Sequence, residues 1–293
     1  MLFASIDIGS NAVRLYFANV FEHKRKTVVE KASLVRIPVR LGEDVFESGR
    51  ISEIRINNLV KTMQAFKLLI EVYKPVDYIV CATSAMREAE NNREIIEKIY
   101  KETGIDIKII DGIEEARILC AANNVVTGKK FNISIYVDVG GGSTDISIVK
   151  DHALIESNSF NLGTIRLLNK NTSEAEWNKL GDWLKTFKND FGKIYLIGSG
   201  GNINKLSKLY STRRDNSLSY TNLKQGYKHL SKLSLRQRIE EMGMRPDRAD
   251  VIIPAAEIFL FIMKTIKADS IFVPRIGLSD GLIYTVYRKY KTS

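Results

Sequence analysis

The sequence contains two copies of one strand–turn–strand pattern, and this duplication limits the fold more than any other feature. "SIDIGSNAVRLYFANV" begins at Ser5 and "YVDVGGGSTDISIVKD" begins at Tyr136. Each copy reads apolar–Asp–apolar–Gly and continues into a second strand. In both halves three strands are followed by a helix and a further strand. A repeat at this scale predicts two related α/β domains, each with a sheet flanked by helices.

The duplication also predicts where the domains divide. We expect the break near Gly128-Lys129-Lys130, which gives domains at residues 1–127 and 128–293. The last apolar helix, from Asp280 onward, could pack back on the first domain, and the sequence does not place it. Two such domains facing each other would form a cleft with both turns directed into it, and clefts at domain interfaces often bind ligands.

The expected elements follow from local patterns. In the first half we expect strands at residues 3–9, 13–20 and 27–37, a helix opened by Ser52, a strand at 77–83, a helix ended by Gly104 and a strand at 107–110. In the second half we expect strands at residues 133–139, 144–150 and 153–160, a helix capped by Ser173, and a strand at 193–198 followed by a helix.

The two turns carry the clearest chemical signal. Successive backbone N–H groups in a glycine-rich turn can converge on phosphate oxygens, and glycine lets a ligand approach closely. The residues concerned are Gly140, Gly141 and Gly142, with Ser10, Asn11, Ser143 and Thr144 as side-chain donors. Asp7 and Asp138 would repel phosphate unless a cation lay between them, and Mg²⁺ suits oxygen ligands of this kind. Two tight hairpins with Asp as a turn residue are the structural alternative; the duplication favours phosphate binding.

Three further motifs are weaker when each is considered alone. Arg87, just past a strand, is either a phosphate ligand or a solvated partner of Glu88 or Glu90. Glu115 is either a general base or, with Asp111 and Glu114, a stabilising charge at a helix N-terminus. A strand–turn–helix pattern at Gly198, Gly200 and Gly201 would accept a phosphate or approach a nucleotide. A basic run follows, and it is either a solvated helix face or a wall that guides a polyanion: Lys205, Lys208, Arg213, Arg214, Lys224, Lys228, Lys232, Arg236 and Arg238.

Composition excludes several classes of protein. The net charge of +10 favours an anionic partner, but no aromatic–basic motif indicates nucleic-acid binding. Three scattered histidines argue against a histidine zinc site, and Cys81 and Cys120 are interpreted as buried thiols in a reducing compartment. "MLFASIDIG" lacks a basic segment, so we expect no signal peptide, and "VIIPAAEIFLFIM" is too short to span a membrane. We therefore expect a cytoplasmic protein.

Together these motifs resemble the exopolyphosphatase / guanosine pentaphosphate phosphohydrolase (Ppx/GppA) family of the actin-like ATPase superfamily. The resemblance runs nearly end to end and rests on motifs in the family's order: "IDIGSNAVRL", "ATSAMREAEN", "DGIEEAR", "VDVGGGSTD", "LGTIRL", "GSGGNI", "RADVIIPAAEIF" and "GLSDGLI". It implies two ribonuclease H-like, actin-like domains with mixed sheets and an active-site cleft between them.

The resemblance also implies roles for particular residues. Glu115 matches the family's catalytic glutamate, which activates water, and Asp138 matches its metal- or water-binding aspartate. Asp7 lies where the superfamily positions its divalent ion, with Asp145 as a further candidate for catalysis and for the metal. Positions that hold the terminal phosphates are matched by Arg87 and by residues of both turns: Ser10, Asn11, Gly140, Gly141, Gly142, Ser143 and Thr144.

The sequence departs from the family at three points. Asp145 stands where the family has Glu, so its carboxylate is shorter by one C–C bond, roughly 1.5 Å. Ala12 replaces a frequent Ser and removes one donor. The chain stops at residue 293 without the C-terminal domain of longer members, so we expect no extended polyphosphate tunnel.

The function that we expect is metal-assisted hydrolysis of a terminal phosphoanhydride, with orthophosphate released from polyphosphate, short chains above all. Mg²⁺ is the expected metal and Mn²⁺ the alternative. A guanosine pentaphosphate 5′-phosphohydrolase and a polyphosphate- or nucleotide-binding regulator with weak turnover remain alternatives, the second favoured by Asp145 and Ala12. We expect no membrane partner; a homodimer is left open.

Overall fold

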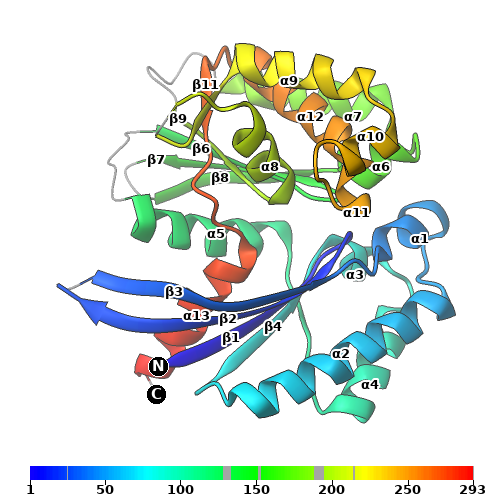
Figure 1. Ribbon diagram of the computed structural model, residues 1–293, viewed down its shortest axis with the longest axis vertical. Coiled ribbons are helices and arrows are strands. Elements are labelled where there is room, and N and C mark those ends of the chain that lie inside the picture. Colours follow the sequence, from blue (N-terminus) through cyan, green and yellow to red (C-terminus); the bar gives the residue numbers. More distant parts are fainter. Residues whose placement is uncertain (25, 128–132, 151–152, 188–194, 214, 293) are drawn as a thin grey trace. The chain divides into compact units, whose positions relative to one another are not determined.

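The protein forms two compact units (Figure 1). The computed structural model describes all residues except 25, 128–132, 151–152, 188–194, 214 and 293. Unit 1 comprises Met1–Val126 and Gly277–Ser293, and unit 2 comprises Thr127–Ile276. The last helix thus belongs with unit 1, so residues 277–293 leave the range 128–293 that was expected for the second domain. The expected break at residues 128–130 lies outside the described residues.

Unit 1 is built on a mixed sheet with strand order β3-β2-β1-β4-β5 among the described residues. Its strands are β1 (Leu2–Ile8), β2 (Val13–His23), β3 (Lys26–Ile37), β4 (Tyr78–Ala82) and β5 (Lys108–Ile109). β1, β2 and β3 pair antiparallel, and β1, β4 and β5 pair parallel. Its helices are α1 (Leu41–Ser48), α2 (Glu53–Tyr73), α3 (Ser84–Glu88), α4 (Asn92–Thr103), α5 (Gly112–Thr127) and α13 (Leu278–Thr292).

Helix α13 explains why β1 is apolar along almost its whole length. The helix contacts β1, β2 and β4, as Figure 1 shows for the red helix against the blue strands. Ile283, Val286 and Tyr287 of α13 pack with Phe3 and Val20 of the sheet. A strand that is covered on both faces has no solvent side on which polar residues would alternate. The sheet of unit 1 therefore depends on a segment that the chain reaches only at residue 277.

Unit 2 is built on a second mixed sheet, with strand order β10-β11-β9-β6-β7-β8 among the described residues. Its strands are β6 (Ile133–Val139), β7 (Thr144–Lys150), β8 (Ala153–Phe160), β9 (Tyr195–Ser199), β10 (Ser217–Ser219) and β11 (Ser270–Phe272). Its helices are α6 (Thr164–Leu168), α7 (Glu174–Thr186), α8 (Gly201–Tyr210), α9 (Tyr220–Lys232), α10 (Leu235–Glu240), α11 (Pro246–Ala249) and α12 (Ile252–Thr265). α12 is apolar almost all round because it lies within the core.

The duplication seen in the sequence is a duplication of topology and register. Strands β8-β7-β6-β9-β11 take the order of β3-β2-β1-β4-β5. Asp7 pairs with Arg14 across the first hairpin, and Asp138 pairs with Asp145 across the second. Each sheet also has one register shift in the next strand pair, after Phe17 and after Ile148, at the same sequence distance from Asp7 and from Asp138. The two α/β units predicted from the repeat are therefore confirmed.

The predictions for three helix ends agree with the structure to different degrees. Ser52 precedes α2 and its Oγ accepts a hydrogen bond from the Arg55 N–H, and Gly104 ends α4 in the left-handed conformation (φ 69°). Ser173 occupies the N-cap position of α7, but its side chain makes no capping hydrogen bond. The sequence patterns therefore locate these three helix ends, but the capping bond predicted for Ser173 is absent.

Candidate functional site

In each unit the predicted site residues gather at one edge of the sheet. The carboxyl ends of parallel strands meet at the same edge, which is where open α/β sheets bind ligands. In unit 1 this edge carries the turn after β1, helix α3 after β4, and the segment from Ile110 to Glu115 after β5. In unit 2 it carries the turn after β6 and Gly200 and Gly201 after β9.

The glycine turn of unit 2 is held from behind by helix α6. The carbonyls of Gly140 and Gly141 accept hydrogen bonds from the N–H groups of Thr164 and Ile165 at 3.0 and 2.8 Å. Arg166 Nε donates to the Gly142 carbonyl at 2.7 Å. Gly163 lies so close that an added Cβ would be 2.2 Å from the Gly141 carbonyl oxygen, so only glycine fits there. The "LGTIRL" segment therefore fixes the direction of three successive peptide units.

This arrangement orients the N–H groups of the turn. In a trans peptide unit the C=O of one residue and the N–H of the next point in opposite directions. Because α6 holds the carbonyls of Gly140, Gly141 and Gly142, the N–H groups of Gly141, Gly142 and Ser143 point away from α6. Successive N–H groups that point to one side form a concave anion site. The turn is thus preorganised to bind an anion such as phosphate.

The first turn, after β1, is held in the same way by a different segment. The Ser10 and Asn11 carbonyls accept from the N–H groups of Gly42 and Arg40 at 2.9 and 3.2 Å. The N–H groups of Asn11 and Ala12 therefore point away from that segment. The Ser10 hydroxyl is buried and lies 2.7 Å from the Ser84 hydroxyl, which joins this turn to the start of α3. Both copies of the repeat thus present backbone donors at equivalent positions.

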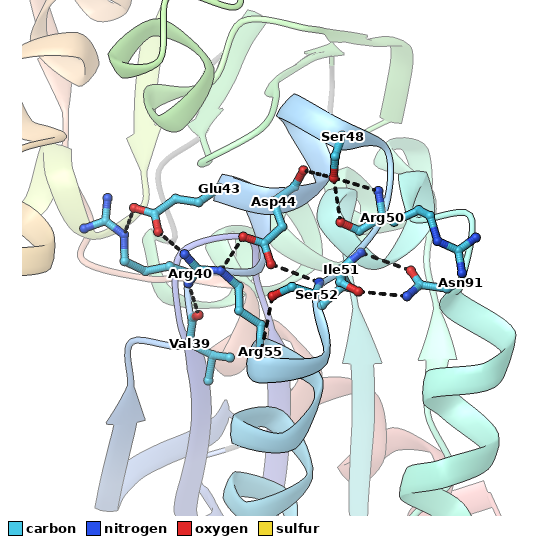
Figure 2. Close-up of polar contacts among 10 residues, drawn as sticks. All are labelled: Val39, Arg40, Glu43, Asp44, Ser48, Arg50, Ile51, Ser52, Arg55 and Asn91. Carbon is cyan, nitrogen blue, oxygen red and sulfur yellow. Dashed lines mark hydrogen bonds and ion pairs between the residues drawn. The ribbon is translucent and has the colours of Figure 1, made fainter.

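A polar network around α1 supports the segment behind the first turn (Figure 2). The Arg55 guanidinium binds the Asp44 carboxylate and the Val39 carbonyl at 2.7 and 2.8 Å, and it also pairs with Glu43. Arg40, held in the left-handed conformation (φ 58°), forms a second ion pair with Glu43. Backbone strain at a non-glycine residue persists only where the surroundings enforce it. The network therefore fixes the residues whose N–H groups hold the turn.

The carboxylates of unit 2 lie beside the glycine turn. Asp138 and Asp145 are directly opposite across β6 and β7, so their side chains lie on the same face of the sheet. The Ser143 hydroxyl donates to Asp145 Oδ2 at 2.9 Å. A Cβ added to Gly200 would lie 2.8 Å from Asp138 Oδ1, so the turn after β9 packs against this carboxylate. Residues from two loops, the turn after β6 and the turn after β9, therefore contact Asp145 and Asp138.

In unit 1 the equivalent pair consists of a carboxylate and a guanidinium instead of two carboxylates. Arg14 occupies the position of Asp145, and its Nη1 lies 2.5 Å from Asp7 Oδ2. Ser279 Oγ also donates to Asp7 Oδ2, at 3.4 Å. A guanidinium in contact with Asp7 opposes binding of a divalent cation there by charge repulsion. The structure therefore brings Asp7 to the site edge of unit 1 but pairs it with a cation.

Arg87 and Glu115 occupy the remaining loops of that edge. Arg87 Nη1 donates to the Ile110 carbonyl at 2.9 Å, which accounts for one of the five N–H donors of a guanidinium. Asp111 caps helix α5 by accepting from the Glu114 N–H at 2.7 Å, and Glu114 forms an ion pair with Lys108. Glu115 is buried, with 8 % of its surface exposed. Asp111 therefore caps helix α5. This leaves less reason to assign Glu115 a stabilising role at the helix N-terminus.

The electrostatics of Cys81 place these carboxylates in one region of unit 1. Burial raises the pKa of the Cys81 thiol to about 12, with further increases from the charges of Glu114, Asp7 and Glu115 and a decrease from Lys108. Cys81 is paired with Asp7 in the register of β1 and β4. The thiol is therefore protonated at neutral pH and takes no nucleophilic role. The side chain of Cys120 lies outside the described residues.

The donor set of unit 2 fits Mg²⁺. Two carboxylates and a hydroxyl offer only oxygen atoms, and Mg²⁺ is commonly held by one or two carboxylates, with water and substrate phosphates completing the shell. Within the described part of the chain, no group of three or more His, Cys, Asp or Glu side chains is placed to hold a metal ion. Of the three carboxylates that the sequence singled out, Asp138 and Asp145 would suit a cation better than Asp7, which is paired with Arg14.

Other predicted residues serve the fold. The Thr144 hydroxyl is fully buried and donates to the Leu162 carbonyl. Gly198 makes room for Ile203 and Ile271, since an added Cβ would lie 2.7 Å from Ile271 Cδ1.

The sequence did not indicate that α6 and the loop before α1 hold the turns. Their contacts join residues more than 20 positions apart and leave no local pattern.

The basic run does not form one wall. Arg238 donates to the carbonyls of Leu233 and Ala249, Arg236 forms an ion pair with Glu240, and Arg214 lies outside the described residues. Lys205 and Lys208 instead line a recess on unit 2 together with arginines from later segments.

No described helix is both long and apolar enough to cross a membrane.

Comparisons with known proteins agree with this geometry. The family model described as "Ppx/GppA phosphatase family" matches residues 20–290. The chain is 30% identical to a bifunctional 3-dehydroquinate synthase/phosphatase of Fusobacterium nucleatum over 92% of its own length, but it spans only 44% of that relative. It is 24% identical to exopolyphosphatase 1 of Mycobacterium leprae, covering 95% of this chain and 87% of the relative.

A third relative and a solved structure extend the match. The guanosine-5′-triphosphate,3′-diphosphate pyrophosphatase of Vibrio atlanticus is 23% identical, covering 99% of this chain and 60% of the relative. The crystal structure of the Aquifex aeolicus Ppx/GppA family member is 26% identical and superposes with a TM-score of 0.78, covering 100% of this chain and 99% of that one. The fold is thus the two-domain actin-like fold, and the named relatives are hydrolases. The chain belongs to the Ppx/GppA phosphatase family.

Proposed function

We propose that this protein hydrolyses the terminal phosphoanhydride bond of inorganic polyphosphate and releases orthophosphate. The observation that carries the proposal is that in each of the two turns the carbonyls are held from behind, so that the N–H groups of that turn point away from the segment that holds it. A polyphosphate end offers oxygen atoms on every phosphorus, which suits such donors. Phosphoryl transfer depends mainly on positioning and charge neutralisation, and preformed N–H groups supply both.

Each residue has a distinct task in this proposal. The N–H groups of Gly141, Gly142 and Ser143 bind the phosphate oxygens, and Arg87 adds a guanidinium. Asp138 and Asp145 hold Mg²⁺, which when bound neutralises phosphate charge. Glu115 accepts a proton from water as the water oxygen bonds to the terminal phosphorus. The bond from that phosphorus to the bridging oxygen breaks, and the electron pair leaves with the shortened chain.

Glu115 is tested by Glu115→Gln, with Glu114→Gln as the matched control on the same helix. A positioned general base contributes about 10²–10⁴-fold to the rate. We expect kcat for polyphosphate to fall by that factor in Glu115→Gln while the Kd of polyphosphate changes little. Glu114→Gln removes only an ion pair with Lys108, so its kcat should stay near the wild-type value. A Glu115→Gln variant with wild-type turnover would remove Glu115 from the mechanism.

The metal assignment is tested by titrating Mg²⁺ against activity. We expect Asp145→Asn to raise the Mg²⁺ concentration for half-maximal activity by about 10–100-fold, because one carboxylate ligand or its water-mediated contact is lost. The control is Asp182→Asn, an exposed carboxylate of the same unit that pairs with Lys185. Equal Mg²⁺ requirements in the two variants would show that Asp145 takes no part in metal binding.

Guanosine pentaphosphate is the alternative substrate, because one relative of similar identity is named as its pyrophosphatase. Phosphate release from polyphosphates of several lengths and from guanosine pentaphosphate, with and without Mg²⁺, separates the two activities. A higher kcat/KM for the nucleotide would replace the proposed substrate. Tight binding without phosphate release, unchanged by Asp145→Glu, would instead indicate a regulator.

A further inference from the structure

The first turn and helix α3 of unit 1 are joined by a pair of serine hydroxyls. Ser10 Oγ, in the turn after β1, lies 2.7 Å from Ser84 Oγ, at the start of α3 after β4. Because β1 and β4 are parallel neighbours, both hydroxyls lie at the edge of the sheet that carries the candidate site. The exposed fractions of Ser10 and Ser84 are only 4 % and 5 %. Ser84 is therefore buried beside the donors of the turn.

The pair has one hydroxyl proton more than its shared bond uses. A serine hydroxyl donates one hydrogen bond and can accept two. The bond between the two oxygens uses one of the two protons, whichever residue donates it. Within the described part of the chain, neither of these hydroxyls makes a second hydrogen bond. One O–H donor is therefore left over, at a buried position where a donor without an acceptor is costly.

A second serine pair in the same protein uses both of its protons. The hydroxyl oxygens of Ser147 on β7 and Ser157 on β8 are 3.0 Å apart. Ser157 Oγ also donates to the Ile146 carbonyl at 3.3 Å, so Ser147 can donate to Ser157 and no proton is left over. Ser147 lies opposite Tyr136, in the middle of its sheet rather than at the site edge. Of these two pairs, the one with a spare donor is therefore the one at the candidate site.

The fold of unit 1 fixes the position of both hydroxyls. The Ser10 carbonyl accepts from the Gly42 N–H at 2.9 Å, and a Cβ added to Gly42 would lie 3.0 Å from Ser10 Cβ. The Thr83 N–H donates to the Ile8 carbonyl at 3.1 Å, which ties the residue before Ser84 to the end of β1. Helices α1 and α3, which carry Gly42 and Ser84, also contact each other (Figure 1). The spare donor is thus preorganised.

We propose that Ser84 is a positioning residue that donates to Ser10, so that the Ser10 hydroxyl donates its own proton to a non-bridging oxygen of the phosphate group bound at the first turn. Ser10 is the residue that meets the ligand because it belongs to the turn that presents the Asn11 and Ala12 N–H groups. Hydrogen bonds in a chain polarise one another, so the bond from Ser84 strengthens the donor that the phosphate meets. The inference rests on the proposed function for the identity of this ligand.

The test is a double-mutant cycle of Ser10→Ala and Ser84→Ala. Each change removes one hydroxyl and inserts no larger group, and thermal unfolding of every variant checks the fold. The matched control is the same cycle at Ser147→Ala and Ser157→Ala, which removes the serine pair in the middle of the sheet of unit 2. Two properties of the full chain are measured. One is binding of tripolyphosphate by calorimetry in EDTA, where metal-dependent turnover is blocked; the other is phosphate release from polyphosphate in Mg²⁺.

We expect Ser10→Ala to weaken tripolyphosphate binding by about 10–100-fold, because a hydrogen bond to a charged oxygen is lost. Ser84→Ala should weaken binding by about 2–10-fold, because the Ser10 hydroxyl remains but loses the bond that orients it. Adding Ser84→Ala to Ser10→Ala should weaken binding no further, since Ser84 acts only through Ser10.

The kinetic effect should appear in KM. The bond from Ser10 is made both before and during the reaction, so its loss raises KM and leaves kcat near the wild-type value. This differs from Glu115→Gln, for which we expect a lower kcat and little change in Kd. The control variants at Ser147 and Ser157 should keep wild-type Kd and KM.

Two results would overturn the proposal. One is a Ser84→Ala variant with wild-type Kd and KM, whatever its melting temperature; the other is a loss from Ser84→Ala that is equally large in the Ser10→Ala background. The outcomes also separate this proposal from the proposed function. Binding that follows the cycle in a protein that releases no phosphate keeps the role of Ser84 and removes the activity. Hydrolysis with a wild-type KM in Ser84→Ala keeps the activity and removes the role of Ser84.

Discussion

Gly200 shows how closely the backbone of unit 2 is fitted to a carboxylate. Its φ of 100° lies where side chains are strained, and an added Cβ would lie 2.8 Å from Asp138 Oδ1. Gly104, at the end of α4, also has a positive φ, of 69°, but no heavy atom within 4 Å of an added Cβ. The two glycines therefore share a backbone requirement and differ in the contact that a side chain would make.

This pair of glycines gives a controlled prediction. We expect Gly200→Ala to lower kcat for phosphate release by roughly a hundredfold, because Asp138 is displaced by about an ångström. Gly104→Ala should lower the free energy of unfolding by about 1 kcal/mol, because its φ is also positive. It should retain the wild-type kcat, because no side chain contacts the added Cβ. Steady-state kinetics and urea unfolding of both variants measure the two effects. Equal activities would show that the position of Asp138 is not critical.

At the residue scale, the sequence predicts what a hairpin fixes locally. The Asp138 and Asp145 pair follows from turn length and strand alternation, and so does the pairing of Asp7 with Arg14. The contact between Gly200 and Asp138 does not follow, because it depends on β9 lying next to β6 in the sheet. Neither do Arg245, Arg248 and Arg275, which reach α8 from distant segments.

At the scale of elements, short segments that the sequence did not predict hold the turns. Helix α6 has only five residues, and the first turn is held by Arg40 and Gly42 at the start of α1, so each of these segments is too short to show apolar periodicity. Hydrophobic patterns, in contrast, correctly predicted the long helices α2 and α4. The elements that position ligand-binding groups were therefore harder to predict than the elements that fill the core.

The network around α1 provides a test of this supporting role. We expect Arg55→Ala to lower the free energy of unfolding by about 1–3 kcal/mol, because the half-buried Asp44 and Glu43 lose a charged partner. Amide exchange at Gly42 should also become faster. The control is Arg50→Ala, whose guanidinium is 53% exposed and pairs with Glu90 and Glu94 at 3.6 and 3.9 Å. Pairs of that kind contribute about 0–1 kcal/mol, so the control should stay close to wild type. An equal effect of the two variants would contradict a specific role for Arg55.

At the scale of the whole molecule, unit 1 is assembled from two separate parts of the chain. Six side chains of α13 have exposed fractions of 6 % or less: Leu278, Leu282, Ile283, Tyr284, Val286 and Tyr287. Burying such a side chain contributes about 1.5–3 kcal/mol, so α13 supplies about 9–18 kcal/mol. This is as large as the net stability of a typical domain, about 5–15 kcal/mol.

A chain that ends after Ile276 should therefore lose the fold of unit 1 and keep that of unit 2. Limited proteolysis followed by mass spectrometry should show cleavage throughout residues 1–126 and protection within residues 127–276. The control is a chain that ends after Arg288, which retains the six buried side chains and should be protected in both units. Protection of residues 1–126 in the shorter chain would contradict the role given to α13. The sequence left the place of this helix open because an apolar helix face does not indicate which sheet it covers.

The divided unit also has a consequence for the order of events on the ribosome. Residues 1–126 emerge first, but β1, β2 and β4 have nothing to cover one face until residues 277–292 have been made. Unit 2 is continuous in sequence, so its core does not depend on residues 277–292. One apolar face of the sheet in the first half of the nascent chain therefore stays uncovered during synthesis. Chaperones recognise apolar surfaces of this kind. The half that is translated first is the half that finishes folding last.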